Sequence, residues 1–445
     1  MHRILIVSPR FPPINAPDLH RVRLSLPHFE DYGWRPEVWA VDPDRVERDR
    51  DPLLEKTVPP RTDVRTVSAP DTRWTRLVGL GSVALRALPS YFWRVSRRLA
   101  RGDVDLVYFS TTAFPVMVLG RYWKWRFGVP YVIDMQDPWH TDYYVGKPKE
   151  EQPPKFWFSY RLHKYLEPVA MRGVDGIVSV SQGYCDTLQA RYDNVVPEMC
   201  EVVPFGAAEV DFEVMEESGV TQPFVDPDDD TIDVVYAGRG GHDMATAARG
   251  LFGALRRGRE ERPALFGRVR MHFVGTSYAP AGEGEKTLEP IAAEYGVADA
   301  VTERTDRIPY FQSLRLLRDA DHLVIPGSDD PDYTASKLYP YILSRQPVLA
   351  AFHENSSVVD ILQKTRAGEA VTYDGSVDVG DLASQVLKTW APMLEQLPYT
   401  PDTDWDAFRP YTAETMTHRQ VEVFDRVLSK TSRVPKETVA SARSG

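Results

Sequence analysis

Cysteine is almost absent from this chain of 445 residues, which contains only Cys185 and Cys200. Two thiols exclude a disulfide framework and a cysteine-based zinc site, and so low a content is typical of reducing compartments. No run of roughly 18 apolar residues occurs, so we expect no membrane-spanning helix. The apolar run 4–7 is too short for a signal peptide and predicts a strand. We therefore expect a cytoplasmic protein, with a position at the inner face of the membrane left open.

Several catalytic signatures are also missing. The sequence has no Gly-x-Ser-x-Gly elbow, no Walker-type loop and no His-Glu-x-x-His motif. Its ten histidines lack metal-ligand spacing, and no Gly-x-Gly-x-x-Gly follows the first apolar run. The net charge of −11 argues against a protein that binds nucleic acid through a global positive potential. We expect no bound metal, no nicotinamide cofactor or other permanently bound cofactor, and no nucleic-acid partner.

What the sequence does contain is a repeated alternation of short apolar runs with amphipathic segments. Residues 3–7 and 36–41 are predicted strands around a helix at 19–29, which makes a βαβ unit. The same alternation continues, with predicted strands at 105–110, 131–135, 176–180, 201–204, 233–238, 269–274, 301–304, 322–326 and 347–351. This rhythm predicts an α/β protein with two Rossmann-like, doubly wound domains.

The polar segment 207–231 is expected to be a solvated linker between these domains or an entry loop, because it is rich in Asp, Glu and Pro. The amphipathic segment 411–429 predicts a final helix. The expected domains are 1–205 together with 411–430, and 206–410, followed by a flexible tail at 431–445.

One candidate anion site follows the first strand of each half, at the place where doubly wound sheets bind their ligands. Asn15 stands at a predicted helix start, whose N–H groups and dipole can hold an anion, with Arg21 and Arg23 behind it. In the second half, Gly238 and Gly240 flank Arg239, so that the backbone can approach a phosphate that the guanidinium binds. An ordinary capped helix and a glycine-rich turn with a surface arginine are the alternatives.

Two further segments follow later strands. Lys337 stands at a predicted helix start, where the dipole disfavours a cation unless an anion bridges it to Arg239. A solvated acidic loop with a surface lysine is the alternative. After the strand at 131–135, Asp137 and His140 are candidates to orient or deprotonate a hydroxyl, with capping and turn roles as alternatives. Asp134 lies within the apolar run and is expected to be structural.

These segments, in this order, resemble the family 4 glycosyltransferases, which have the GT-B fold. Residues 4–13, 131–139 and 180–181 are similar to the family's first domain. Residues 236–239 and 336–349 are similar to the start and the donor-site helix of its second domain. The resemblance implies two Rossmann-like domains facing an interdomain cleft, with the C-terminal helix crossing back to the first domain.

The resemblance also implies an activity. Such enzymes transfer a sugar, without a metal and with retention at the anomeric carbon, from a nucleotide-sugar to an acceptor. We expect a hexosyltransferase that acts on a glycan or lipid-linked acceptor in polysaccharide or glycoconjugate biosynthesis. The family's roles place the donor diphosphate on Arg239 and Lys337, and the sugar hydroxyls on Asp332. Arg307 and Ile308 fall where relatives read the nucleobase.

One departure from the family leaves other functions open. The second of the family's paired acids, which usually grips the ribose, is replaced here by Pro340. A proline cannot accept a side-chain hydrogen bond, so a catalytically degenerate protein that binds a nucleotide-sugar or a glycan is one alternative. A GT-B nucleotide-sugar epimerase is the other.

The segment 73–101 stands apart, because no acidic residue occurs between Asp71 and Asp103. Arginines alternate there with tryptophan, tyrosine, phenylalanine and leucine. Such a segment is expected in a surface that faces the membrane, while a buried helix with a basic outer face is the alternative.

Overall fold

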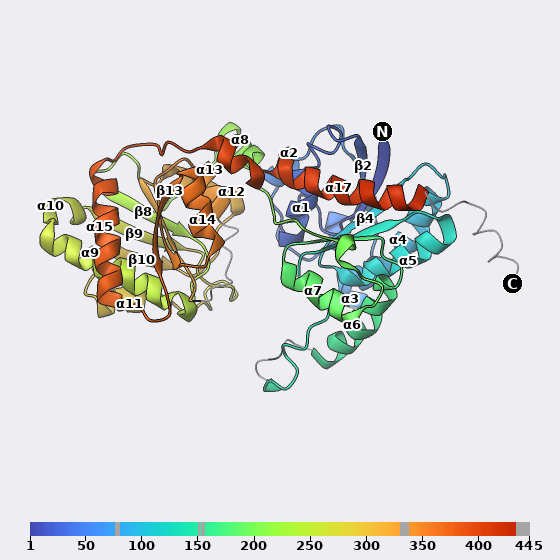
Figure 1. The fold of residues 1–445 in the computed structure, drawn as a ribbon, viewed down its shortest axis with the longest axis horizontal. Helices are drawn as coiled ribbons and strands as arrows, with labels where there is room; N and C mark the ends of the chain where they lie inside the picture. Colours follow the sequence, from blue (N-terminus) through green and yellow to red (C-terminus); the bar gives the residue numbers. More distant parts are fainter. Residues whose placement is uncertain (76–80, 150–151, 153–155, 330–337, 433–445) are drawn as a thin grey trace, which may run out of the picture. The chain divides into compact units, whose positions relative to one another are not determined.

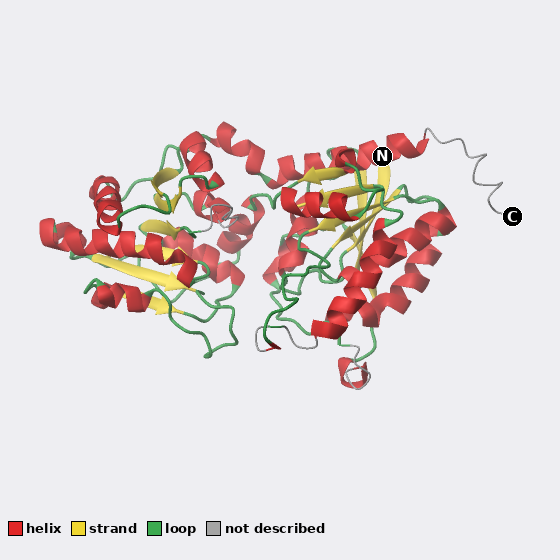
Figure 2. Ribbon diagram, turned by 60° about the horizontal axis from the view of Figure 1, so that its bottom comes forward, coloured by secondary structure: helices red, strands yellow, loops and turns green. Residues whose placement is uncertain are grey.

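The computed structural model describes residues 1–75, 81–149, 152, 156–329 and 338–432. It divides into two compact units, Met1–Gly206 with Ala413–Gly445, and Ala207–Thr412. Each unit has a parallel sheet with helices packed on it (Figures 1 and 2). The predicted α/β class with two doubly wound halves is therefore confirmed. No helix in the described part of the chain combines the length and the apolar character that a bilayer span needs.

The sheet of the N-terminal unit has the order β3-β2-β1-β4-β5-β6-β7. Every neighbouring pair of strands in it is parallel. The order reverses between β1 and β4, and this switch point is where doubly wound sheets bind ligands. The strands are β1 His2–Val7, β2 Trp34–Val41, β3 Asp63–Val67, β4 Leu106–Ser110, β5 Tyr131–Met135, β6 Gly176–Ser179 and β7 Cys200–Val202.

Helices cover both faces of this sheet. Neighbouring strand residues face opposite sides, and Tyr108 packs with Phe424 of α17, whereas Phe109 stacks on Trp123 of α5. One layer therefore contains α1 and α17, and the opposite layer contains α5 with its neighbours α4 and α6. The helices of the unit are α1 His20–Ser25, α2 Leu53–Lys56, α3 Thr72–Thr75, α4 Val83–Leu99, α5 Val118–Phe127, α6 Phe156–Met171, α7 Gln182–Arg191 and α17 Ala413–Ser432.

The last helix, α17, returns to the N-terminal unit, as predicted (Figure 1). Its apolar side chains join a core cluster with β1, β2, β4, β5 and β6. Phe424 is fully buried, with its ring 5.4 Å from Trp34 and 5.0 Å from Tyr108. Gln420 accepts a hydrogen bond from the Tyr108 hydroxyl. Residues 431 and 432 of the expected tail belong to this helix, and residues 433–445 lie outside the described residues.

The sheet of the C-terminal unit has the order β10-β9-β8-β11-β12-β13 and is also parallel, with its reversal between β8 and β11. Its strands are β8 Ile232–Ala237, β9 Val269–Val274, β10 Val301–Arg304, β11 His322–Pro326, β12 Val348–His353 and β13 Gly368–Tyr373. Its helices are α8 Glu209–Glu217, α9 Ala245–Glu261, α10 Pro263–Phe266, α11 Glu289–Glu294, α12 Tyr310–Asp319, α13 Leu338–Leu343, α14 Ser357–Thr365, α15 Val379–Glu395 and α16 Trp405–Phe408.

Two local expectations were wrong. The predicted linker 207–231 contains helix α8, because Phe212 and Met215 are buried and Asp211 accepts a 2.6 Å hydrogen bond from the hydroxyl of Tyr310. Asn15 is not an N-cap. The 3₁₀ helix Pro17–Leu19 begins after Ala16, without a side-chain cap, and the backbone N–H of Asn15 donates to the carbonyl of Asp49 instead.

Candidate functional site

A buried carboxylate stands at the switch point of the N-terminal unit. Asp18 is 2% exposed, and its Oδ2 accepts hydrogen bonds from Arg10 Nη1 at 2.8 Å, Thr111 Oγ1 at 2.8 Å and Thr112 N at 3.0 Å. Arg10 follows β1, while the two threonines follow β4. Asp18 Oδ1 is buried without a hydrogen-bond partner among the described residues. Buried acceptors are normally paired, so this oxygen could receive a hydrogen bond from a ligand hydroxyl.

A second buried network lies beside it. Asp134 Oδ2 accepts hydrogen bonds from Ser110 Oγ at 2.7 Å, Gln136 Nε2 at 2.7 Å and Arg21 Nε at 3.2 Å. Asp134 therefore has the structural place expected for it. Arg21 and Arg23 are both buried. The alternative of an ordinary capped helix expected these two arginines to be solvated, and they are not.

Asp137 and His140 follow β5 and lie in different environments. Desolvation by the surrounding protein is the main cause that raises the pKa of the Asp137 carboxyl, and the nearby carboxylate of Asp18 is the second. Part of the Asp137 side chain nevertheless faces solvent. Burial, and next the charge of Arg191, lower the pKa of His140, so its imidazole is neutral at pH 7. Its ring packs 4.9 Å from that of Tyr160. A carboxyl with a raised pKa and a neutral imidazole are both suited to proton transfer.

Arg239 and Asp243 form an ion pair at the switch point of the C-terminal unit. The guanidinium binds the carboxylate through both oxygens, with Nη1–Oδ1 at 3.0 Å and Nη2–Oδ2 at 2.6 Å. Ser328, which follows β11, donates its hydroxyl to Asp243 Oδ2 at 2.7 Å. Arg239, and less strongly Ser328, lower the pKa of Asp243. These contacts tie together the carboxyl ends of β8 and β11.

Packing accounts for two glycines around Arg239. A Cβ at Gly238 would lie 2.6 Å from the ring of Tyr236, and a Cβ at Gly240 would lie 2.8 Å from the hydroxyl oxygen of Thr287. The hydroxyl of Tyr236 donates to the carbonyl of Arg239 at 2.8 Å and so fixes the turn. The tight turn thus requires glycine whether or not a phosphate binds, and the phosphate role of Gly238, Arg239 and Gly240 stays a prediction.

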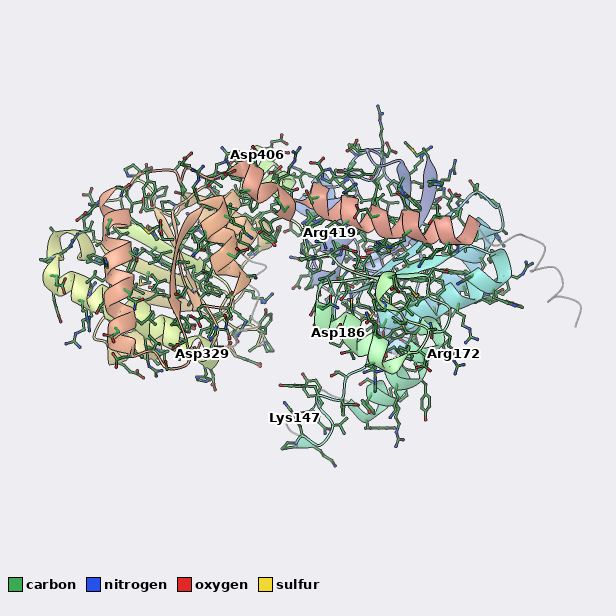
Figure 3. All side chains as sticks on the ribbon, viewed as in Figure 1. Lys147, Arg172, Asp186, Asp329, Asp406 and Arg419 are labelled. Carbon is green, nitrogen blue, oxygen red and sulfur yellow. The ribbon has the colours of Figure 1, made fainter. Side chains whose placement is uncertain are left out.

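Arg307 and Ile308 follow β10 at the same edge of the sheet. The guanidinium carbon of Arg307 lies 4.1 Å from the ring centroid of Tyr278, which belongs to the loop after β9 and is 69% exposed. Ile308 is partly buried. An exposed arginine on an aromatic ring offers flat surfaces on which a planar base can stack. Asp332 and Lys337 lie outside the described residues, which stop on this side at Asp329, labelled in Figure 3.

Sequence reasoning missed Arg10, Asp18, Thr111, Asp243 and Ser328. These residues follow or flank the strands on either side of the two reversals, so the strand order would have predicted that they lie together. That order is not visible in the linear pattern of apolar runs. Within the described residues, no three His, Cys, Asp or Glu side chains are grouped so that they could hold a metal ion.

Comparison with known proteins identifies a domain in the N-terminal unit and the fold of both units. Residues 20–206 match the family model of the glycosyl transferase 4-like domain. The N-terminal unit therefore contains a family 4-like glycosyltransferase domain, and the two parallel sheets have the GT-B arrangement that the resemblance implies. The expected resemblance to family 4 is therefore confirmed, and the matched domain lies within the unit that contains the Asp18 network. No curated protein sequence matches this GT-B chain.

Solved structures show the same fold along the whole chain. Anabaena HepE, solved with UDP-glucose, has 15% identity and a TM-score of 0.52, and the match covers 96% of this chain and 100% of HepE. The UDP-forming α,α-trehalose-phosphate synthase of Burkholderia xenovorans has 12% identity and a TM-score of 0.54, over 98% and 100% of the two chains. A glycosyltransferase of Rickettsia africae has 11% identity and a TM-score of 0.53, over 96% and 98%.

Proposed function

We propose that this GT-B protein transfers a sugar, in the manner of a hexosyltransferase, from a nucleotide-sugar to a glycan or lipid-linked acceptor. The family 4-like domain at residues 20–206 is the observation that carries the proposal. Two relatives of the same fold favour a uridine nucleotide, because one was solved with UDP-glucose and the other is named for forming UDP. A UDP-sugar is therefore the first donor to test. Polysaccharide or glycoconjugate synthesis in the cytoplasm is the setting that fits such a donor and acceptor.

The C-terminal unit is the proposed donor side. When the bond between the anomeric carbon and the diphosphate breaks, its electron pair passes to the diphosphate oxygen, where negative charge develops. Cations already in place stabilise that charge most effectively. Arg239 is held in one orientation by Asp243, and we assign it to the diphosphate together with Lys337. Asp332 is assigned to the sugar hydroxyls, on the strength of the family resemblance alone.

Asp243 sets a condition on this assignment. Because its carboxylate accepts hydrogen bonds from both terminal nitrogens of Arg239, a diphosphate must either displace it or share the guanidinium with it. Ser328 would keep Asp243 hydrogen-bonded after such a displacement. Arg307 and Ile308, with Tyr278 beside them, are assigned to the nucleobase.

The N-terminal unit is the proposed acceptor side. The acceptor oxygen forms the new bond to the anomeric carbon, and its proton passes to a base. Asp137 has the raised pKa expected of such a base, and His140 is a neutral second candidate. Asn15, in the loop after β1, is still assigned to the donor, although it belongs to the unit proposed as the acceptor side. Retention of the anomeric configuration and independence from metals are proposed from the resemblance.

A donor screen followed by product analysis tests the function. Melting temperatures are measured with UDP, GDP, ADP and their sugars, and the stabilising sugar is then incubated with envelope glycolipids and soluble glycans. We expect one nucleotide class to raise the melting temperature by mass action, and one acceptor to gain a sugar with the donor's anomeric configuration, also in EDTA. If no nucleotide stabilises the protein, the proposal is wrong.

Pro340 supports a second candidate, a nucleotide-sugar-binding protein without turnover. It lies in α13, at the position where the resemblance places a ribose-binding acid. Tight donor binding with no product from any acceptor would favour this candidate. Conversion of the donor sugar to its epimer without any acceptor would instead indicate an epimerase.

A further inference from the structure

Exposed aromatic side chains are concentrated on one part of the N-terminal unit. Among the described residues, thirteen large hydrophobic side chains are exposed, and eight of them lie between Trp74 and Tyr165. Three tryptophans mark successive helices: Trp93 on α4, Trp125 on α5 and Trp157 at the start of α6. They are 70%, 73% and 66% exposed. A globular protein rarely exposes so many tryptophans in one region without a partner.

These three helices lie next to one another (Figure 1). The rings of Phe92 on α4 and Tyr122 on α5 are 4.9 Å apart, and Trp123 Nε1 donates to Ser96 Oγ at 3.0 Å. Helix α5 packs in turn on α6. The outward side chains recur at helical spacing, so each helix presents a single stripe. We call these stripes the α4–α6 surface: Trp93, Arg94, Arg97, Arg121, Trp125, Arg126, Trp157, Phe158, Arg161, Lys164 and Tyr165.

The outward charged side chains of α4, α5 and α6 are all basic. An exposed carboxylate that contacts these helices, Asp142, accepts a hydrogen bond from Tyr160 of α6. Helices α4 and α5 contain no Asp or Glu, and the single acid of α6, Glu167, is buried in contact with Arg191. This absence contrasts with the net charge of −11 of the whole chain. Arg94, Arg97 and Arg121 are exposed and form no ion pair with any described residue.

The inward arginines of α4 do not belong to this surface. Arg98 is 4% exposed and binds Glu37 and Asp103, and Arg86 is 3% exposed and binds Glu47. Their charges are compensated inside the unit. Helix α4 therefore buries two arginines of the segment 73–101 and exposes others, while residues 76–80 lie outside the described part. The membrane-facing interpretation of this segment stays a prediction.

We propose that the α4–α6 surface binds the headgroup region of an anionic lipid bilayer. Tryptophan prefers the interface between water and hydrocarbon, and arginines near an anionic leaflet each strengthen the attraction. Three amphipathic helices with aromatic and basic side chains and no exposed carboxylate of their own meet both conditions. The inference deepens the proposed function, since it would hold the transferase beside a lipid-linked acceptor. The binding itself requires neither donor nor transfer.

Sedimentation with vesicles tests the proposal on the full chain, without donor or acceptor. Vesicles of phosphatidylcholine with 30% phosphatidylglycerol are compared with vesicles of phosphatidylcholine alone. We expect binding to the anionic vesicles only, and a loss of binding as salt is raised. The triple variant Arg94→Gln, Arg97→Gln, Arg121→Gln should lower the partition coefficient about a hundredfold, from roughly fivefold per cation. The double variant Trp93→Ala, Trp125→Ala should also weaken binding, with little change in salt dependence.

A matched control removes the same charge elsewhere in the unit. Arg35, Arg48 and Arg61 are exposed, lie outside α4, α5 and α6, and form no ion pair with any described residue. Their replacement by Gln should leave vesicle binding close to that of the wild type. Equal losses in the two triple variants would show a net-charge effect and overturn the proposal. Binding to soluble heparin but not to vesicles would also overturn it, by assigning the surface to a polyanion.

Discussion

At the scale of single residues, the two switch points are built alike. Each has an arginine after the first strand of its sheet, an aspartate bound to that arginine, and a hydroxyl from the strand across the reversal. Arg10 and Asp18 form the pair in the N-terminal unit, and Arg239 and Asp243 form it in the C-terminal unit. A carboxylate that fixes a guanidinium reduces the ordering that a ligand must impose, so both arginines are preorganised.

Arg239→Ala tests the donor side. Loss of a hydrogen bond between charged groups costs about 1.5–3 kcal/mol, so affinity for the nucleoside diphosphate found in the screen should fall about tenfold or more. Arg256→Ala is the control, because Arg256 forms the same kind of i,i+4 pair, with Glu260, on the exposed side of α9. Isothermal titration calorimetry should show a weaker Arg239 variant and an unchanged Arg256 variant. Unchanged affinity in both would remove Arg239 from the site.

Asp137→Asn should separate stability from activity. The pKa of Asp137 is raised above 3.8 in the folded protein, so the folded state favours the protonated carboxyl. The stability that this protonated carboxyl provides is complete below pH 3.8 and is lost as the pH rises through the folded pKa. The amide cannot ionise, so the variant should melt at a higher temperature than the wild type at pH 7, and this gain should vanish below pH 3.8.

If Asp137 is the base, the same variant should lose roughly 10²–10⁴-fold in kcat. Asp193→Asn removes an exposed carboxylate elsewhere in the same unit and should keep its activity. Equal activity in the two variants would assign the base elsewhere, with His140 as the next candidate.

Asp134→Asn tests the buried network. The change leaves the Arg21 charge, which is 1% exposed, without its carboxylate partner. Breaking a buried ion pair in this way destabilises a protein by about 3–5 kcal/mol. Asp44→Asn, which breaks the exposed pair with Arg50, should leave the urea transition nearly unchanged. Similar midpoints for the two variants would show that the Arg21–Asp134 pair has no structural role.

At the scale of elements, the sequence predicts the central strands well and some edge strands poorly. A strand between two neighbours is buried on both faces and forms a continuous apolar run, as at β1, β4 and β5. Strands β3 and β13 are edge strands with several polar side chains, and no apolar run predicted them. Helix α8 was missed for a similar reason, since its acidic face resembles a solvated linker.

The candidate site was predicted only as segments. The candidates after β1, β5 and β8 were proposed because an apolar run followed by Gly, Pro or a charge is visible in the linear sequence, whereas Arg307 and Ile308 after β10 were proposed from the family resemblance alone. The pairs Arg10–Asp18 and Asp243–Ser328 join segments 8 and 85 residues apart, and only the folded backbone brings these side chains into contact. Their geometry depends on packing, which a pattern of residue types does not specify.

Phe424→Ala tests the return of α17 to the first sheet. The ring is fully buried between Trp34 and Tyr108, so its removal leaves a cavity that the surrounding rings fill only in part. We expect the N-terminal unit to lose about 3–5 kcal/mol of unfolding free energy. Glu422→Ala, at an exposed position of the same helix, should change the denaturant midpoint little. An unaffected Phe424 variant would mean that the unit does not depend on α17.

At the scale of the whole molecule, each unit has a sheet and a core of its own, and α17 ties the end of the chain to the N-terminal unit. Multidomain proteins of this kind commonly unfold in more than one transition. A ligand that binds a folded unit stabilises it by about 2.7 kcal/mol at a hundred times its dissociation constant. The donor should therefore act on one of the two units more than on the other.

Hydrogen exchange with and without the nucleoside diphosphate measures that difference. Because Arg239 and Arg307 belong to the unit Ala207–Thr412, we expect slower exchange mainly in peptides of that unit, above all after β8 and β10. The Arg239→Ala variant at the same ligand concentration is the control and should show a smaller effect. Protection confined to Met1–Gly206 would place the nucleotide on the unit that contains Asp18, and the two units would then exchange the donor and acceptor roles assigned to them.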